Sequence, residues 1–197
     1  MDKDRVYVGS MDHKVYAIDR QRGTQVWVRD IGGSVPGSVA LDDGLLFVGG
    51  VDKKLHALKV EDGTVIWSQF LGHWVWGEAL VHEGYVYVGS LDGKLHALRV
   101  SDGAERWPAI ALSSAVRAGP VLLNGYLVMG TESGQVYRIA LDDGQAEVLY
   151  TATAAVLSRP AVVGSRIYVG TTVGEVLALD AGGATASQSW IYPPKTK

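Results

Sequence analysis

The chain has 197 residues, of which 47% are hydrophobic and 20% charged, a composition that suits a globular protein with a sizeable core. Its 18 Lys and Arg residues nearly balance 21 Asp and Glu residues, which disfavours nucleic acid and anionic membrane surfaces as partners. It has no cysteine, which excludes disulfides, thiolate metal sites and a cysteine nucleophile. It also has no apolar run long enough to span a membrane.

A β-rich pentad ending in glycine recurs five times along the chain. The spacing between successive copies is 40 or 41 residues, and the pentads end at Gly9, Gly49, Gly89, Gly130 and Gly170. A period near 40 predicts a propeller or a solenoid, in which each unit buries its apolar face only against its neighbours. We therefore look for function where one copy differs from the others.

The third copy shows the internal plan of one repeat. Residues 78–82 form a short extended run, residues 85–90 and 94–100 alternate apolar and polar side chains, and residues 104–107 begin a fourth strand. The turns between them are Glu83-Gly84, Asp92-Gly93 and Asp102-Gly103. Glycine supplies the positive φ that tight hairpin turns require, so we interpret the acidic residues as turn residues. Each copy is thus predicted to be a four-stranded antiparallel meander, a unit that fits a propeller blade.

A tryptophan follows the last turn glycine by four residues in each of the first three copies. These residues are Trp27, Trp67 and Trp107, in the segments YAIDRQRGTQVW, HALKVEDGTVIW and HALRVSDGAERW. The segments resemble the PQQ-type β-propeller repeat, and the resemblance covers nearly the whole chain. The family includes quinoprotein dehydrogenases and the BamB-type outer-membrane assembly lipoprotein. The resemblance implies an all-β propeller of four-stranded blades.

In propellers of this family the tryptophan packs across the neighbouring blade, so Trp27, Trp67 and Trp107 are expected to dock adjacent blades. The fourth copy has Val148 at this position. The fifth copy reaches Trp190, a fourth docking tryptophan, only after a two-residue expansion at residues 182–185. Blade junctions in this half of the chain are therefore expected to be weaker or reshaped.

The repeats predict one propeller domain over residues 1–197. Its blades lie at about residues 1–30, 34–70, 75–111, 116–151 and 156–193.

The first copy begins with its second strand, so one inner strand is missing, and residues 193–197 cannot continue a ladder. Because PQQ-type propellers usually have seven or eight blades, five copies predict an arc of a larger ring. A five-bladed ring with one three-stranded blade is the alternative. An open arc exposes apolar blade faces, which would favour homo-oligomers or aggregation.

Two histidines attract attention as metal ligands but fit packing better. His56 and His96 occupy the same repeat column as Leu177, and repeat-related positions lie on different blades without carboxylate or cysteine companions. We predict no metal site.

The link at residues 71–78, LGHWVWGE, departs from the repeat. Successive copies have Ser34, Trp74, Ala115 and Ala155 at one position, and Pro36, Trp76, Arg117 and Leu157 at another. A propeller's links lead into its innermost strands, beside the central channel. The candidate binding residues are therefore His73, Trp74, Trp76, Glu78, Arg117 and Arg159, a set suited to a flat anionic ligand or a protein partner. The alternative is that both indoles fill the channel or a blade junction.

No catalytic residues are predicted. Quinoprotein dehydrogenases hold the quinone with calcium, carboxylates and amides, whereas this chain has one asparagine, Asn124, and chiefly Glu78 as an inner carboxylate. We therefore expect no cofactor: PQQ is possible for a member of this family, but the site residues do not support it. We favour a non-catalytic scaffold that binds a protein or an envelope component. A fragment of a quinoprotein dehydrogenase and a ligand-sensing domain of a larger protein remain alternatives. Residues 1–5 lack the apolar region of a signal peptide, while the family resemblance suggests a periplasmic or extracellular full-length protein.

Overall fold

The structure is a computed structural model that describes residues 1–182 and 186–193. The described residues form five antiparallel sheets, one of three strands and four of four strands. Among them there is no helix of the length and hydrophobicity needed to cross a membrane. The all-β propeller predicted from the repeats is confirmed.

The strands follow one another in chain order within each sheet. The first two sheets contain β1 (Arg5–Gly9), β2 (Lys14–Asp19) and β3 (Gln25–Asp30), then β4 (Ala40–Asp42), β5 (Leu45–Gly49), β6 (Lys54–Lys59) and β7 (Val65–Phe70). The third contains β8 (Leu80–His82), β9 (Tyr85–Gly89), β10 (Lys94–Arg99) and β11 (Ile110–Ala111). The last two contain β12 (Val121–Leu123), β13 (Tyr126–Gly130), β14 (Gln135–Ala140) and β15 (Ala146–Thr151), then β16 (Ala161–Val163), β17 (Arg166–Gly170), β18 (Val176–Asp180) and β19 (Ser187–Tyr192).

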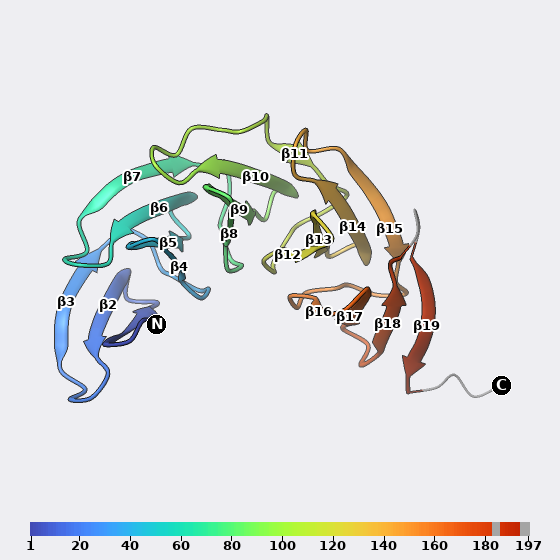
Figure 1. Cartoon of the computed structure of the whole chain (residues 1–197), viewed down its shortest axis with the longest axis horizontal. Helices are drawn as coiled ribbons and strands as arrows, with labels where there is room; N and C mark the ends of the chain where they lie inside the picture. Colours follow the sequence, from blue (N-terminus) through green and yellow to red (C-terminus); the bar gives the residue numbers. More distant parts are fainter. Residues whose placement is uncertain (183–185, 194–197) are drawn as a thin grey trace.

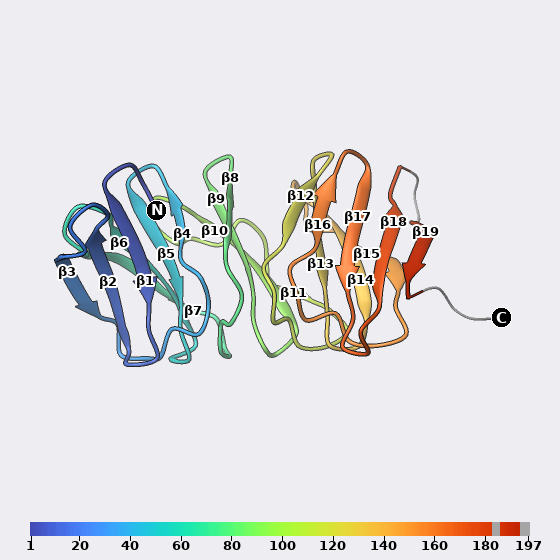
Figure 2. The same cartoon turned by 90° about the horizontal axis from the view of Figure 1, so that it is seen from below.

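The sheets stand side by side as blades of an open arc (Figure 1). The short strands β4, β8, β12 and β16 line its concave side, and β3, β7, β15 and β19 lie on its convex side. Seen from below, the strands run between two opposite faces of the arc (Figure 2). The first sheet consists of β1, β2 and β3, which confirms that the described chain has no inner strand in this blade.

The core is divided among the junctions between neighbouring blades. At the second junction, for example, Phe47 and Leu55 from one blade pack with Val86, Val88 and Leu98 from the next. Each of these five side chains is fully buried. A blade is therefore stabilised mainly by its neighbours, as the repeat period implies.

The pentad glycines have a steric origin. A Cβ on Gly49 would lie 2.3 Å from Cγ1 of Val75, the buried valine of the following link. The same collision would occur between Gly89 and Val116 and between Gly130 and Val156, each also at 2.3 Å. Any larger residue would displace the link. The recurring glycine thus marks the place where each link crosses beneath its blade.

The first three blades contact their neighbours through the repeat tryptophans. The Nε1 atom of Trp27 donates to Val60 O at 2.9 Å, that of Trp67 to Val100 O at 2.8 Å, and that of Trp107 to Leu141 O at 3.3 Å. Each indole also lies against a turn glycine of the next blade, namely Gly63, Gly103 or Gly144. That these contacts stabilise the blade junctions stays a prediction, which substitution of the tryptophans can test.

Two local expectations are wrong. In the third blade, residues 104–107 do not form a regular fourth strand: Glu105 makes an isolated bridge to Leu98, and pairing resumes only at β11. Pro108 lies in the gap, and proline has no N–H to donate to a ladder. In the fourth blade, Arg138 stands at the repeat position of Ala17 and Ala57, which pair with Trp27 and Trp67. A bulge after Val136 places Glu147, and not Val148, opposite Arg138.

The fourth and fifth blades meet without an indole. Leu149 is buried in the cluster shared with the fifth blade, and its carbonyl accepts a hydrogen bond from Ala186 N at 3.1 Å. In the fifth blade Trp190 pairs with Ala178, as Trp27 pairs with Ala17. The expansion expected at residues 182–185 and the prolines expected to stop the ladder fall largely on residues 183–185 and 194–197, outside the described part.

Candidate functional site

The candidate site lies where four links lead into the inner strands. Each link connects the outer strand of one blade to the inner strand of the next. The links are residues 31–39, 71–79, 112–120 and 152–160. Parts of all four border one shallow cavity of about 350 Å³. Four of the side chains that line it are Trp76, Glu78, Arg117 and Arg159. Together with Glu132, which pairs with Arg117, we call them the inner-rim site.

The inner-rim site rests on backbones that stack directly on one another. A Cβ on Gly37 would lie 2.3 Å from Trp76 O, one on Gly77 would lie 2.6 Å from Ala118 C, and one on Gly119 would lie 2.0 Å from Glu78 O. No side chain fits between these links, so glycine is required for their close approach. The stacking fixes the positions from which Trp76, Glu78 and Arg117 project.

Arg117 connects the indole to a carboxylate. Its guanidinium carbon lies 5.6 Å from the centre of the Trp76 ring, within the range of a cation–π interaction. Its Nε atom donates to the carboxylate of Glu132, a residue of the next hairpin in the fourth blade. The Arg117 and Glu132 side chains are each 36% exposed, so the pair is accessible from the solvent.

A second ion pair crosses an entire blade. Arg159 Nη1 lies 3.0 Å from Glu78 Oε2, although 81 positions separate the two residues in the chain. Glu78 leads into the third blade and Arg159 into the fifth, so the pair spans the link to the fourth. The two side chains are 37% and 40% exposed, and a pair of this kind contributes little to stability.

The electrostatics of the inner-rim site differ from those of a free cationic pocket. Each guanidinium group is paired with a carboxylate, Arg117 with Glu132 and Arg159 with Glu78. The four charges balance, and Trp76 supplies the aromatic surface beside them. The arrangement can therefore contact a partner through an aromatic ring framed by charge-assisted hydrogen-bonding groups.

Two of the predicted site residues lie apart from this cluster. The Trp74 side chain is 41% exposed, and its ring centre lies 5.8 Å from that of His73. The Trp74 carbonyl accepts a hydrogen bond from Leu91 N at 3.0 Å, which ties the link to the hairpin of the third blade. The structure thus brings Trp76, Glu78, Arg117 and Arg159 together and leaves His73 and Trp74 on the neighbouring surface.

The two repeat histidines are buried in polar surroundings. His56 Nε2 lies 3.0 Å from Asp52 Oδ2, and its Nδ1 lies 2.8 Å from Ser68 Oγ. His96 Nε2 lies 3.2 Å from Ser90 Oγ, but its buried Nδ1 has no partner in the described structure. Burial lowers the pKa of His56, and it lowers the pKa of His96 from 6.5 to about 4. Within residues 1–182 and 186–193 there is no group of three His, Asp or Glu that could hold a metal ion.

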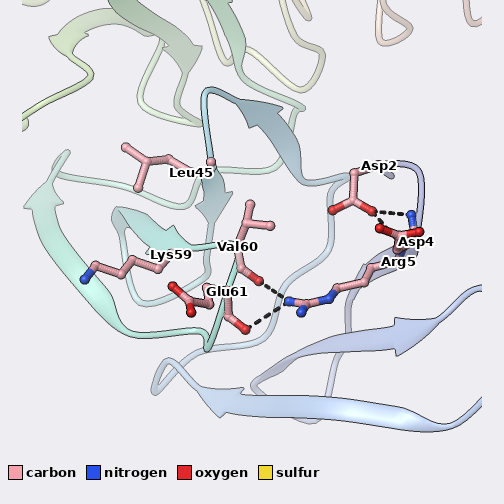
Figure 3. Close-up of a pocket in the computed structure, with 8 residues that line it drawn as sticks. Asp2, Asp4, Arg5, Leu45, Lys59, Val60 and Glu61 are labelled. Carbon is pink, nitrogen blue, oxygen red and sulfur yellow. Dashed lines mark hydrogen bonds between the residues drawn. The ribbon is translucent and has the colours of Figure 1, made fainter.

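A larger groove between the first and second blades was not anticipated from the sequence (Figure 3). It measures about 560 Å³, and Arg5 Nη1 crosses it to donate to Val60 O and Glu61 O, both at 2.9 Å. Asp2 accepts a hydrogen bond from Tyr7 at 2.6 Å. Burial and this hydrogen bond raise the pKa of Tyr7 to about 12. Arg5 is thus satisfied across the blade junction and Asp2 within the first blade, and neither residue belongs to a repeated motif.

Comparison with known proteins agrees with this architecture. A sequence model of the family described as outer membrane protein assembly factor BamB matches residues 1–115 and 109–196. BamB from Moraxella catarrhalis has a similar structure, with a TM-score of 0.83 and 18% identity over 95% of this chain and 60% of that one. This chain therefore spans about 60% of the length of that protein. A search of curated protein sequences finds no match.

Two designed proteins share the fold. The computationally designed Ika8 protein has a TM-score of 0.81 and 15% identity, over 90% of this chain and 56% of its own. The computationally designed Ika4 protein has a TM-score of 0.69 and 15% identity, over 77% of this chain and 93% of its own. At such low identity these likenesses concern the fold alone.

Proposed function

The chain belongs to the family of the outer membrane protein assembly factor BamB, and from this membership we propose that it is a non-catalytic scaffold holding a protein partner at the inner-rim site. A BamB-like propeller supports a protein-interaction role in general. The partner and the place of binding are the specific parts of the proposal.

The observation that carries the proposal is the pairing of Trp76 with Arg117 on the concave side of the arc. Tryptophan and arginine are the residues most enriched among interface hot spots, which tend to be surrounded by groups that exclude water. Here the indole is half-buried, and two ion pairs frame it. Because the four charges balance, the site favours a protein surface with its own aromatic or aliphatic anchor over a small anion.

We propose that the partner is a component of outer-membrane protein assembly in the bacterial envelope. The printed description of the matching family supports this class of partner, and it also supports a periplasmic place of action. Trp74, exposed on the adjacent surface, would extend the contact area. The proposed role requires neither a metal nor a quinone, and nucleic acid is not part of it.

Site-specific photo-crosslinking tests the partner and its position together. A photoreactive phenylalanine derivative replaces Trp76 in one variant and, in the control, Val163, which is 67% exposed at the end of β16. The proposal predicts a crosslink to an outer-membrane assembly component from position 76 and none from position 163. Crosslinks of equal yield from both positions, or none from position 76 in a folded variant, would contradict it.

The quinoprotein alternative has its own test. The chain is heated with and without PQQ and calcium, and reduction of an artificial electron acceptor is followed with a range of alcohols. The scaffold proposal predicts an unchanged melting temperature and no dye reduction, because a ligand that binds only the folded state must raise the melting temperature. A stabilising shift accompanied by dye reduction would replace the scaffold with an enzyme.

A further inference from the structure

The second blade contains a continuous hydrogen-bonded chain of a carboxylate, a histidine and a serine. His56 Nε2 lies 3.0 Å from Asp52 Oδ2, and His56 Nδ1 lies 2.8 Å from Ser68 Oγ. Burial lowers the pKa of His56, so at neutral pH the ring carries one proton. An ionised carboxylate only accepts hydrogen bonds, so this proton is on Nε2, and Nδ1 accepts from the Ser68 hydroxyl. Ser68 thus donates to a free histidine nitrogen, as activated nucleophiles do.

A glycine in the second blade lets the carboxylate reach the histidine. Gly50 stands where the other four copies have a hydroxyl side chain, namely Ser10, Ser90, Thr131 and Thr171. A Cβ on Gly50 would lie 2.5 Å from Asp52 Oδ1. In the third blade Ser90 donates to the corresponding carboxylate of Asp92, and its Oγ, 3.2 Å away, is the partner of His96 Nε2. The direct contact between carboxylate and histidine therefore depends on glycine at position 50.

The serine is also particular to the second blade. Pro108 occupies its position in the third blade, where the buried Nδ1 of His96 has no partner among the described residues. Val28 occupies it in the first blade, where Tyr16 replaces the histidine and donates directly to Asp12. An aspartate bonded to the third strand of a blade is thus enough to anchor the hairpin. Anchoring of the hairpin therefore does not explain the hydroxyl at position 68.

The backbone N–H of Ser68 faces the free edge of its sheet. β7 is the last strand of the second sheet, and Ser68 is exposed, whereas His56 is 4% exposed. Leu71 N donates to Lys53 O at 2.8 Å, and bonded and non-bonded pairs alternate along an antiparallel ladder. Counted from that bonded pair, Ser68 and His56 form a non-bonded pair, whose side chains lie close together and whose N–H groups point away from each other. The Ser68 N–H is therefore available beside its own Oγ.

We propose that Ser68 is a nucleophile that accepts an acyl group from activated esters, with His56 as its base and Asp52 as the positioning residue. Ser68 Oγ attacks the carbonyl carbon of the ester and its proton passes to His56 Nδ1, while Asp52 holds the proton on Nε2. The Ser68 N–H donates to the oxyanion of the tetrahedral intermediate. The bond from that carbon to the leaving oxygen then breaks, the alcohol or phenol departs with the proton from His56, and the acyl ester of Ser68 remains.

The reaction is a single transfer, so it leaves the scaffold role and the inner-rim site as they stand. Ser68 lies on an exposed edge, which an acyl donor reaches directly from the solvent. Phe70, two positions further along the strand, has its side chain on the same face and is 61% exposed. An apolar side chain beside the nucleophile favours donors with an apolar acyl group. The class of ligand is therefore an activated ester of an aliphatic acid.

Acylation by p-nitrophenyl butyrate tests the proposal. Tandem mass spectrometry of proteolytic fragments measures the rate at which each serine gains a butyryl group. Ser101, exposed in the turn after β10, is the internal control, since no histidine is bonded to it in the described structure. Ser68 is expected to react at least about a hundredfold faster than Ser101, because general-base catalysis typically supplies a factor of this size or more. Equal rates at the two serines would overturn the proposal.

Two variants separate activation of the serine from folding of the blade. His56→Leu introduces the residue that the fifth copy has at the same repeat position, Leu177, and Asp52→Asn keeps the shape of the side chain but loses the charge that holds the proton on Nε2. Far-UV circular dichroism and thermal melting confirm that each is folded. Acylation of Ser68 should slow by about a hundredfold in His56→Leu and at least about tenfold in Asp52→Asn, while acylation of lysines stays unchanged. A folded variant of either kind in which Ser68 reacts at the wild-type rate would overturn the proposal.

Discussion

Replacing Trp67 with alanine probes how much a single blade junction contributes to stability. The indole packs 5.9 Å from the Phe47 ring, lies 2.9 Å from the position of a Cβ on Gly103, and donates to Val100 O at 2.8 Å. Tryptophan-to-alanine changes in protein cores lower the free energy of unfolding by about 3–5 kcal/mol. The net contribution of one hydrogen bond to stability is about 1 kcal/mol. Because Trp67 is only partly buried, we expect a decrease of about 3 kcal/mol in the free energy of unfolding.

The matched control is Trp190→Ala, which removes the same side chain from the same ladder position in the fifth blade. Trp190 contacts Tyr168 within its own sheet, at 5.9 Å between rings, and among the described residues its side chain is 44% exposed. We expect a loss of about 1 kcal/mol, since less apolar area is withdrawn from water. Urea unfolding followed by circular dichroism compares the two. Equal losses from both variants would refute the view that the indole acts across the junction.

Three further outcomes follow from the structure. Because the pKa of His96 is about 4 when folded and 6.5 when unfolded, stability should fall as pH drops from 6.5 towards 4, by up to about 3 kcal/mol, and His96→Leu should flatten this decline in urea titrations. Gly130→Ala should lower the free energy of unfolding by about 2 kcal/mol, because the new Cβ collides with the link valine Val156. In the control Gly170→Ala the nearest atom would be 3.6 Å from the new Cβ, so the free energy of unfolding should change by less than about 0.5 kcal/mol. Equal losses from the two variants would contradict the steric explanation. Glu78→Gln should cost less than about 1 kcal/mol, since its pair with Arg159 is exposed; a larger loss, or one unaffected by salt, would show that the pair is shielded from solvent.

The blades could be predicted because their determinants lie within one repeat. Each of the first four pentad glycines makes room for a valine 26 or 27 positions later, as Gly49 does for Val75 and Gly89 for Val116. Each turn glycine adopts a positive φ, as Gly103 does at 73°. Such requirements recur at every copy and therefore leave a periodic trace. The broken strand in the third blade also had a visible signal, Pro108, which the periodic pattern outweighed.

The inner-rim site could be predicted only in part. Departure from the repeat drew attention to Trp74 and Trp76, but the pattern could not show that only Trp76 borders the cavity. Glu132 was missed because it belongs to a hairpin and not to a link, although its carboxylate pairs with Arg117. The contact between Glu78 and Arg159 skips a whole blade, and the repeat, which relates adjacent blades, carries no information about it.

The most direct test of the central claim is the affinity of this chain for the outer-membrane assembly component identified by crosslinking from position 76. Isothermal titration compares the wild-type chain with Trp76→Ala, with Arg117→Ala and with Val163→Ala as the exposed control. If the inner-rim site is the hot spot, Trp76→Ala and Arg117→Ala should each weaken binding at least tenfold, or about 1.4 kcal/mol, while the control binds as the wild type does. Unchanged affinity in the folded Trp76 and Arg117 variants would show that the partner binds elsewhere on the propeller.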